Sequence, residues 1–407
     1  MSISQPYRLA NAIQHYEWGS RGKNAYIPRL LDIDITKDIP YAELWIGSHP
    51  RLPSTVLVAG EIVSLLDLIN RHPEEMLGSQ SLQRFGSRLP FMLKVLSAER
   101  SLSIQAHPNK QQATILHKNN PIHYPDDNYK PEIAIAIDHL HALIGFKPWD
   151  ELVQTLYDIP QLGLYAGQGL AQALIDLHSF DDLSKKITLK AFFQGMMERS
   201  IQEDGFLGEC LEQIHEKILK TKQPSAHAIL FCKLREQYPK PDIGLLSMFL
   251  YNLLELQPGE AIFLDAGMPH SYIEGNLIEC MANSDNVVRA GLTPKFKDVR
   301  LLVDILTYEC KRPEIMRVDP ENITHRYPLN IPDFMVLRHA PRAMQSAVCT
   351  THGMPQILLC LEGSGQLSLG EKNLPFQRGS SLFIPACLPS FKLTAQADSL
   401  LFQAGVP

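Results

Sequence analysis

The chain has 407 residues, more than one ordinary hydrophobic core accommodates, so we expect two or three domains. Hydrophobic residues make up 45% of it and charged residues 20%, as in a globular protein, and the net charge of −6 argues against a general nucleic-acid binder. No apolar run has membrane-spanning length, no secretory signal is visible, and the seven cysteines form no C-x-x-C pair. We therefore expect a cytoplasmic protein with reduced thiols and no membrane partner.

Residues 1–148 alternate short β-like runs with proline-rich turns, which predicts the first part of a β domain. The clearest run is Glu132–Ile137, which reads E-I-A-I-A-I and has the two-residue period of a strand. Further strands are predicted over Ser54–Leu57, Phe91–Ser97 and Leu102–Ala106. Helices are predicted over Val63–Asn70 and just after Pro108.

Residues 149–257 contain little proline and show helical periodicity, which predicts an inserted, all-helical domain of about six helices. The predicted helices are Glu151–Leu156, Leu170–Leu177, Leu183–Ser200, Leu207–Leu219, Ala226–Gln237 and Ile243–Leu256.

Residues 258–318 return to β-texture and are predicted to complete the first β domain, with a strand over Glu260–Leu264 and a helix over Phe296–Leu306. Residues 319–407 form a predicted second β domain. Its short strands, spaced by turns, favour a small antiparallel barrel or sandwich. They are Phe334–Arg338, Gln356–Leu361, Gly365–Leu369, Ser381–Ile384 and Ser399–Phe402.

An internal repeat relates the two β domains. Residues 259–270 and 379–390 align without a gap, each as a glycine turn, a five-residue strand, a second turn, a proline and one further residue. That final residue is His270 in the first copy and Ser390 in the second. The repeat resembles the second motif of cupin barrels, so we predict two related barrels or jelly rolls, of which the second has lost a metal ligand.

Polar side chains gather at three predicted strand ends. Ser103, Gln105 and His107 alternate along one face of a strand, Glu132 begins another, and His270 follows a third. Taken singly, each suits an ordinary exposed or hydrogen-bonded position. Together, the last four offer two nitrogens and two oxygens, a set suited to a divalent ion such as zinc.

The stretch from Asp265 to Lys295 carries further groups of catalytic type. Glu279 lies within the apolar segment Leu277–Met281, where burial would raise its pKa. Arg289 stands beside glycine and proline, and Cys280 is the one cysteine close to this chemistry.

Seven ordered blocks identify the family that the chain resembles. It resembles the type I mannose-6-phosphate isomerases, and the match spans most of the chain. The blocks are Y-E-W-G (16–19), E-L-W-I-G (43–47), P-F-M-L-K-V-L (90–96), L-S-I-Q-A-H-P (102–108), K-P-E (130–132), D-A-G-M-P-H (265–270) and M-A-N-S-D-N-V-V-R-A-G-L-T-P-K (281–295).

The resemblance implies a zinc-dependent, monomeric cupin-type enzyme. It would interconvert mannose 6-phosphate and fructose 6-phosphate through a cis-enediol(ate), within mannose and GDP-mannose metabolism. Its zinc ligands would be Gln105, His107, Glu132 and His270, and its catalytic arginine Arg289. We further expect Lys130 and Glu279 to act as an acid–base pair. Expected substrate contacts are Trp18, Ser103, Tyr272 and Lys295.

One position departs from the family pattern. Many members carry a histidine just before Lys-Pro-Glu, where this chain has Tyr129, so a ring-opening role for that histidine cannot be transferred. Two rival functions remain: an iron-dependent cupin oxygenase, and a sugar-binding cupin without catalysis. Gln105 occupies a position that an oxygenase leaves open for oxygen, and a non-catalytic protein is expected to have lost Arg289 or a metal ligand.

Overall fold

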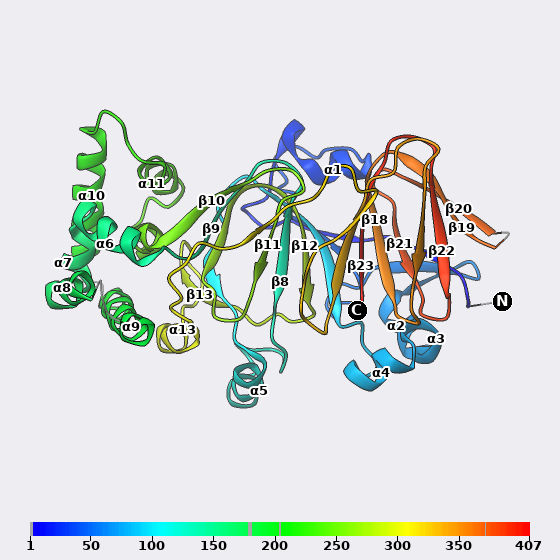
Figure 1. The fold of residues 1–407 in the computed structure, drawn as a ribbon, viewed down its shortest axis with the longest axis horizontal. Coiled ribbons are helices and arrows are strands. Elements are labelled where there is room, and N and C mark those ends of the chain that lie inside the picture. Colours follow the sequence, from blue (N-terminus) through cyan, green and yellow to red (C-terminus); the bar gives the residue numbers. More distant parts are fainter. Residues whose placement is uncertain (1–2, 178–180, 203–204, 371) are drawn as a thin grey trace.

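The computed structural model describes residues 3–177, 181–202, 205–370 and 372–407. Two β units lie side by side, and a block of helices extends from the outer end of the first unit (Figure 1). The fold is therefore mainly β with a helical insertion, as the sequence predicts. Among the described residues, no helix combines the length and apolarity that a membrane span requires.

The first β unit consists of two layers that share the thirteen-residue strand β12 (His270–Ala282). One layer has the order β14-β11-β8-β12-β6-β3-β2, in which β12 pairs antiparallel with both β6 and β8. In the other layer, β12 pairs with β7 and β9, and β13 and β10 extend the two edges. The remaining strands are β2 (Ala12–Gln14), β3 (Glu43–Ile46), β6 (Phe91–Ala98), β7 (Ile104–Ala106), β8 (Glu132–Ala136), β9 (Leu140–Phe146), β10 (Tyr251–Leu256), β11 (Ala261–Leu264), β13 (Val288–Gly291) and β14 (Ile315–Met316).

Gly275 marks the place where β12 passes from one layer to the other. Its φ is +120°, a conformation that L side chains rarely adopt, and a Cβ there would lie 2.4 Å from the carbonyl oxygen of His139. The register of β12 against β9 also shifts between Tyr272 and Glu274. A glycine therefore lets one strand present His270 and Glu279 to the same interior.

The C-terminal unit repeats this plan on a smaller scale. A six-stranded sheet has the order β1-β21-β18-β23-β16-β15, and a four-stranded sheet has the order β17-β22-β19-β20. The described pairings close neither unit into a barrel, so both are open jelly rolls and the barrel alternative is wrong. The strands are β1 (Tyr7–Arg8), β15 (Thr324–Arg326), β16 (Met335–His339), β17 (Ser346–Thr350), β18 (Gln356–Glu362), β19 (Ser364–Leu369), β20 (Lys372–Gln377), β21 (Ser381–Ile384), β22 (Ser390–Ala395) and β23 (Leu400–Gly405).

Three apolar clusters fill the two units and the space between them. One fills the interior of the first unit and includes Leu96 and Leu264, and another fills the second and includes Leu358. The largest shared cluster lies between the units, where Val95 of β6 and Val336 of β16 are completely buried. Each unit thus buries both faces of its inner sheet, which fixes the strands that carry the site.

The inserted helices confirm most of the helical prediction, with one error. The helix predicted over Ile243–Leu256 is wrong, because α12 ends at Ser247 and residues 251–256 form β10, which pairs with β9. The short helix α7 had no counterpart among the predicted helices. The bounds are α6 (Trp149–Asp158), α7 (Gln161–Ala166), α8 (Gln168–Asp176), α9 (Asp182–Arg199), α10 (Phe206–Leu219), α11 (Ala226–Gln237), α12 (Ile243–Ser247) and the single turn η2 (Met248–Leu250).

Short elements complete the first unit. The helix predicted over Val63–Asn70 begins only at Leu65, because residues 61–64 form the second strand of a hairpin. The predicted helix Phe296–Leu306 is confirmed over Val299–Ile305. These elements are β4 (Thr55–Val58), β5 (Glu61–Ser64), η1 (Gly22–Asn24), α1 (Tyr26–Leu31), α2 (Leu65–Arg71), α3 (Pro73–Leu77), α4 (Ser79–Phe85), α5 (Lys110–Asn119) and α13 (Val299–Ile305).

Candidate metal centre

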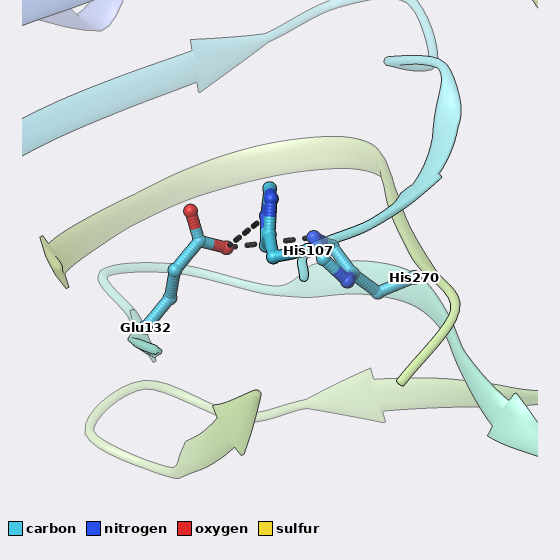
Figure 2. A group of neighbouring side chains, drawn as sticks. All are labelled: His107, Glu132 and His270. Atoms are coloured by element: carbon cyan, nitrogen blue, oxygen red, sulfur yellow. Dashed lines mark ion pairs between the residues drawn. The ribbon is translucent and has the colours of Figure 1, made fainter. Parts of the chain in front are cut away.

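Three side chains at the ends of separate strands converge in the interior of the first β unit. Glu132 Oε2 lies 3.5 Å from His107 Nε2 and 3.4 Å from His270 Nε2 (Figure 2). All three residues are about 99% buried. Among the described residues, His107 Nε2 and Glu132 Oε2 have no hydrogen-bond partner, which is costly at such burial. Orphaned donor atoms that face one another are the arrangement that a divalent cation satisfies.

The backbone fixes the orientation of both imidazole rings. His107 Nδ1 lies 2.8 Å from the carbonyl oxygen of Asn286, and His270 Nδ1 lies 3.0 Å from that of Met268. A ring that donates through Nδ1 presents the lone pair of Nε2, so both histidines have the tautomer that a metal requires. Gly267 ties the two loops together, because its N–H donates to the carbonyl oxygen of His107.

The charge state of the cluster also suits a cation. Burial lowers the pKa of His107 to about 4, against the opposing effect of Glu132, so this ring is neutral at pH 7. Burial alone would raise the pKa of Glu132, but Lys130 and His107 outweigh burial and hold that pKa well below its ordinary value. Lys130 Nζ lies 2.9 Å from Glu132 Oε1. The cluster therefore contains an ionised carboxylate and at least one unprotonated imidazole.

Gln105 lies at the edge of this cluster. It is opposite His270 where β7 pairs with β12, and its Nε2 lies 3.4 Å from His270 Nε2. Its Oε1 lies 3.4 Å from the Ser103 hydroxyl, which donates to it. Turning the amide over exchanges its nitrogen and oxygen, and Oε1 then faces the same point as the two histidines. The structure thus brings all four predicted ligands together.

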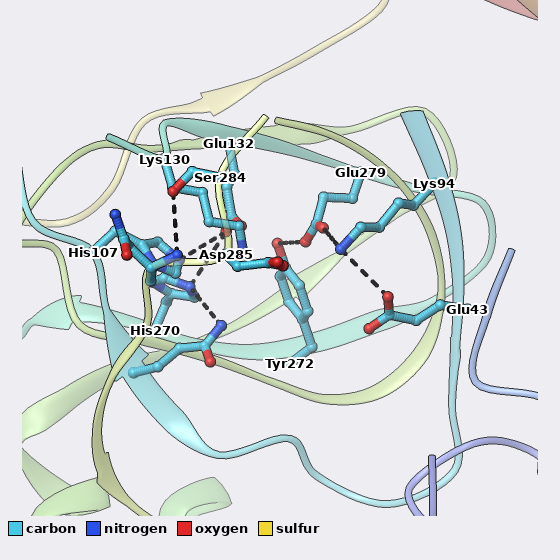
Figure 3. Close-up of polar contacts among 12 residues, drawn as sticks. Glu43, Lys94, His107, Lys130, Glu132, His270, Tyr272, Glu279, Ser284 and Asp285 are labelled. Atoms are coloured by element: carbon cyan, nitrogen blue, oxygen red, sulfur yellow. Dashed lines mark hydrogen bonds and ion pairs between the residues drawn. The ribbon is translucent and has the colours of Figure 1, made fainter. Parts of the chain in front are cut away.

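A second buried cluster adjoins the first, as Figure 3 shows. Lys94 Nζ lies 3.3 Å from Glu279 Oε1 and 3.3 Å from Glu43 Oε2, and the Tyr272 hydroxyl donates to Glu279 Oε2 over 3.2 Å. Burial, followed by the charge of Glu132, raises the pKa of Glu279. Burial disfavours the charge on Lys94, but Glu43 and Glu279 overcome this and raise its pKa. Trp45 Nε1 donates to Glu43, so each carboxylate has a second partner.

Two cations near the centre have no acidic partner among the described residues. Arg289 lies opposite Gln105 where β13 pairs with β7, and Lys295 follows it along the chain. Burial lowers the pKa of both, and the charge of Arg289 is the second cause for Lys295, so the two cations are close. No ion pair is formed by either within the described part of the chain. Lys295 instead lies 5.9 Å from the Tyr16 ring centroid.

Comparison with known proteins assigns the family. The profile of the phosphomannose isomerase type I catalytic domain matches residues 7–149, and that of the mannose-6-phosphate isomerase cupin domain matches residues 327–401. The chain is 36% identical over 428 residues to the mannose-6-phosphate isomerase of Homo sapiens, covering 99% of both. It is 36% identical over 419 residues to mannose-6-phosphate isomerase 2 of Arabidopsis thaliana, covering 98% of this chain and 93% of that one. The chain belongs to the type I phosphomannose isomerase family.

Solved structures of the family share the whole fold. The Salmonella typhimurium enzyme bound to substrate (F6P) and zinc superposes with a TM-score of 0.84 at 30% identity, covering 98% of this chain and 99% of that one. A zinc-bound mannose 6-phosphate isomerase has the same TM-score at 31% identity and the same coverage. The family resemblance drawn from the seven sequence blocks is therefore confirmed.

The position that departs from the family pattern points away from the metal centre. The Tyr129 hydroxyl donates to a carboxylate oxygen of Asp333, which belongs to the segment before β16. Burial, with this hydrogen bond as the second cause, raises the pKa of Tyr129. Tyr129 thus joins the two β units, and its loop leads directly into Lys130 and Glu132.

Two further predicted substrate contacts, Trp18 and Tyr272, lie in or beside the same interior. The Trp18 ring stacks on Tyr16 at a centroid distance of 6.0 Å and packs against the interior of the first unit. Tyr272 is 2% exposed, and its hydroxyl contacts Glu279 within that interior. Sequence reasoning missed Lys94 and Glu43 as partners of Glu279. The available signal was the single lysine in the otherwise apolar run P-F-M-L-K-V-L, since an unpaired lysine is rarely buried.

Proposed function

We propose that this chain is a zinc-dependent aldose–ketose isomerase that interconverts mannose 6-phosphate and fructose 6-phosphate. Family membership over the full length supports the reaction. The single observation that carries it is the convergence of His107, Glu132 and His270, whose facing ligand atoms lie within 4.8 Å of one another in a buried site. Neither an oxygenase nor a non-catalytic cupin finds comparable support, because the relatives are named as isomerases.

The chemistry of the donors fits zinc. The ion would be held by the imidazole nitrogens of His107 and His270, a carboxylate oxygen of Glu132 and the amide oxygen of Gln105. Glu132 is the only anion among the four, so the bound ion keeps positive charge. When bound, zinc would orient the sugar hydroxyls and polarise an oxygen beside the carbon that loses its proton.

The reaction moves a proton between two neighbouring sugar carbons through an enediol(ate). We assign the acid–base work to Glu279 and Lys130 as a pair. Glu279 is buried, has a raised pKa and is held by Tyr272 and Lys94, so its proton affinity is closer to neutral than that of an ordinary carboxylate. Lys130 is also buried and contacts the carboxylate ligand Glu132, so it lies directly beside the metal centre.

The two unpaired cations suit the negative charge of substrate and intermediate. Arg289 lies beside Gln105, and we assign it to the oxyanion that forms next to the metal centre. Lys295 lies farther along the same chain segment, and we assign it to the phosphate. Ser103, Trp18 and Tyr272 complete the proposed substrate contacts.

The proposal is tested by assaying conversion of mannose 6-phosphate before and after chelation, and again after zinc is restored. Activity should vanish with the metal and return with it. A parallel sample in which Glu132 is replaced by Gln should not recover, whereas Glu17→Gln, which changes an exposed carboxylate, should. Full turnover by metal-free protein would contradict the ligand assignment.

We also propose a monomeric, cytoplasmic enzyme. Every proposed site residue comes from one chain, so the site needs no second subunit, and all seven cysteines are free thiols, as expected in a reducing compartment. The domain boundaries proposed are residues 1–148 with 258–318 for the catalytic unit, 149–257 for the insertion and 319–407 for the second cupin unit. The insertion so defined ends in β10, which pairs with β9 of the catalytic unit.

A further inference from the structure

A cavity opens into the C-terminal jelly roll, away from the metal centre. Its volume is about 570 Å³, which falls within the size range of small-molecule sites. Strands β15, β16, β17 and β23 supply most of its walls, and Gln80 of α4 reaches it from the first unit. It is lined by Gln80, Thr324, Arg326, Met335, Leu337, His339, Val348, Cys349, Thr350, His352, Met354, Gln403, Val406 and Pro407.

Strand register makes this cavity the counterpart of the metal centre. In the first unit, Glu132 lies opposite Leu264 of β11. In the second, Gln356 lies opposite Ile384 of β21, and Leu264 and Ile384 occupy the same place in the repeated segment. Gln356 therefore stands where Glu132 stands, with an amide in place of the carboxylate.

The same comparison places the other groups. Glu279 pairs with Ala134, two residues after Glu132, and Gln403 pairs with Leu358, two residues after Gln356. Gln403 is thus the counterpart of Glu279. On the neighbouring strand, Lys94 lies opposite Glu279 and Leu337 lies opposite Gln403. Where the first unit has the ion pair between Lys94 and Glu279, the second unit has the amide of Gln403 beside Leu337.

The positions of the metal ligands also carry less strongly coordinating residues in the second unit. His270 lies opposite Gln105 in the first unit, and Ser390 lies opposite Thr350 in the second. His352 follows Thr350 by two residues, as His107 follows Gln105, and is the one position of this set that still has a metal-binding residue type. Its Nε2 lies 2.7 Å from the Thr350 hydroxyl. The positions that carry carboxylates and metal-binding histidines in the first unit thus carry mostly neutral polar side chains here. This part of the cavity therefore suits neither a metal ion nor acid–base chemistry.

The retained polar groups form a directional chain of hydrogen bonds. His339, which is 1% exposed, lies with Nδ1 2.9 Å from the Thr324 hydroxyl and with Nε2 2.8 Å from Gln403 Oε1. Gln403 Nε2 donates to Gln356 Oε1 over 2.9 Å, and Gln356 Nε2 donates to the carbonyl oxygen of Thr350 over 3.0 Å. Because a primary amide has two N–H donors, each glutamine keeps one donor beyond this chain.

We propose that this cavity is a second binding site, for the hydroxyl face of a monosaccharide-sized molecule. Gln403, which lines the cavity, would offer its spare amide donor to the oxygens of this molecule, and Met335, Leu337 and Met354 form an apolar wall of the kind that covers the C–H face of a sugar. Arg326 is exposed and lines the same cavity, where a phosphorylated sugar would find its charge partner. The site is independent of the isomerase reaction.

The cavity is also joined to the catalytic unit. The backbone N–H groups of Ala386 and Cys387 donate to the carbonyl oxygens of Met76 and Glu75 in α3. A Cβ on Gly78 would lie 2.1 Å from the carbonyl oxygen of Gly353, close to His352. The segment that carries Gln80 thus packs tightly on the loops beside the cavity, which fixes this part of its wall.

Methionine methyl groups allow both sites to be followed in one experiment. Met335 and Met354 line the cavity, whereas Met281 lies opposite Glu132 and packs with Met92 on Trp45. Zinc-loaded protein carrying ¹³C-methyl methionine would be titrated with D-mannose and, separately, with mannose 6-phosphate. We expect at least one of the two to shift the Met335 and Met354 signals, which shows whether the ligand is a free or a phosphorylated sugar.

Two variants test the assignment. Gln403→Leu should weaken the binding reported by Met335 and Met354 at least 10-fold, while Gln377→Leu, on an exposed part of β20, should not. Leu337→Trp, which fills the cavity and leaves the amides intact, should abolish it even where Gln403→Leu is poorly folded. The proposal is overturned if neither sugar moves these two signals, or if the shifts survive Leu337→Trp. Failure of the isomerase assignment would appear instead in turnover and in the Met281 and Met92 signals.

Discussion

Replacing Lys94 by Met removes the only cation that contacts two buried carboxylates at once within the described structure. Lys94 lies 3.3 Å from both Glu43 and Glu279, and its side chain is 8% exposed. Methionine has nearly the same length and no charge, so the change leaves little cavity. Its effect is therefore mainly electrostatic.

The expected loss is large because the two acids remain buried. Breaking a buried ion pair from one side costs about 3–5 kcal/mol, since the partner charge stays in a medium of low polarity. For a cooperative unit of roughly 200 residues, with an unfolding entropy of about 2.1 cal/mol/K per residue, this lowers Tm by about 7–12 °C. The hydrogen bonds from Trp45 to Glu43 and from Tyr272 to Glu279 remain in the variant and still stabilise the two carboxylates, which favours the lower end of that range.

The loss should also depend on pH with a defined sign. The pKa of Glu279 is raised in the folded protein, so the folded state loses stability as pH rises above the pKa that Glu279 has in the unfolded chain. Removal of Lys94 takes away a positive charge and strengthens this loss. The variant should therefore lose more stability at pH 8 than at pH 5.

Thermal unfolding followed by circular dichroism at these two pH values measures both quantities. Lys37→Met, which changes an exposed lysine of the first unit, is the control, and Lys94→Met with Glu279→Gln should recover part of the loss. An equal, small change in Tm at both pH values would refute the electrostatic account.

Three further predictions concern metal, charge and pH. Glu132→Gln should reduce retained zinc roughly 100-fold or more, because the only anionic ligand is lost; zinc content after dialysis measures this, and full retention would contradict it. Arg289→Lys keeps a charge without the planar fork and should reduce kcat by about 10²–10³-fold with a smaller change in KM; an unchanged kcat would remove Arg289 from the chemistry. Burial lowers the pKa of His227 to about 4, and its ring donates to the Tyr251 carbonyl, so stability should fall by up to about 3 kcal/mol as pH drops from 6.5 to 4. His227→Gln should flatten this dependence in urea unfolding, and an unchanged slope would assign it elsewhere.

The metal cluster was predictable from sequence because its signal is local. Alternation placed Gln105 and His107 on one strand face, and Glu132 opens an unmistakable strand. The ends of those strands therefore could bring two histidines and a carboxylate together in a β domain. The structure adds the reason the rings face inward, which lies in the carbonyl oxygens of Met268 and Asn286, and backbone acceptors leave no mark in a sequence.

What escaped prediction depends on contacts between distant residues. The run after Ser247 is apolar enough for a helix, and only its pairing with β9, more than a hundred residues earlier, makes it strand β10. Lys94 is similar, since its partners Glu43 and Glu279 lie on either side of it in sequence, the latter beyond the entire helical insertion. Long-range pairing overrides local preference at both places.

The pairing of β1 with β21 bears on how the chain folds during synthesis. Tyr7 lies opposite Phe383, and Leu9 donates to the carbonyl oxygen of Ser381. At about 5–20 residues per second, this first strand waits roughly 20–75 s for its partner to be made. Through that interval the backbone donors and acceptors of β1 stay open to other chains, so β1 is prone to mispairing until β21 has been made.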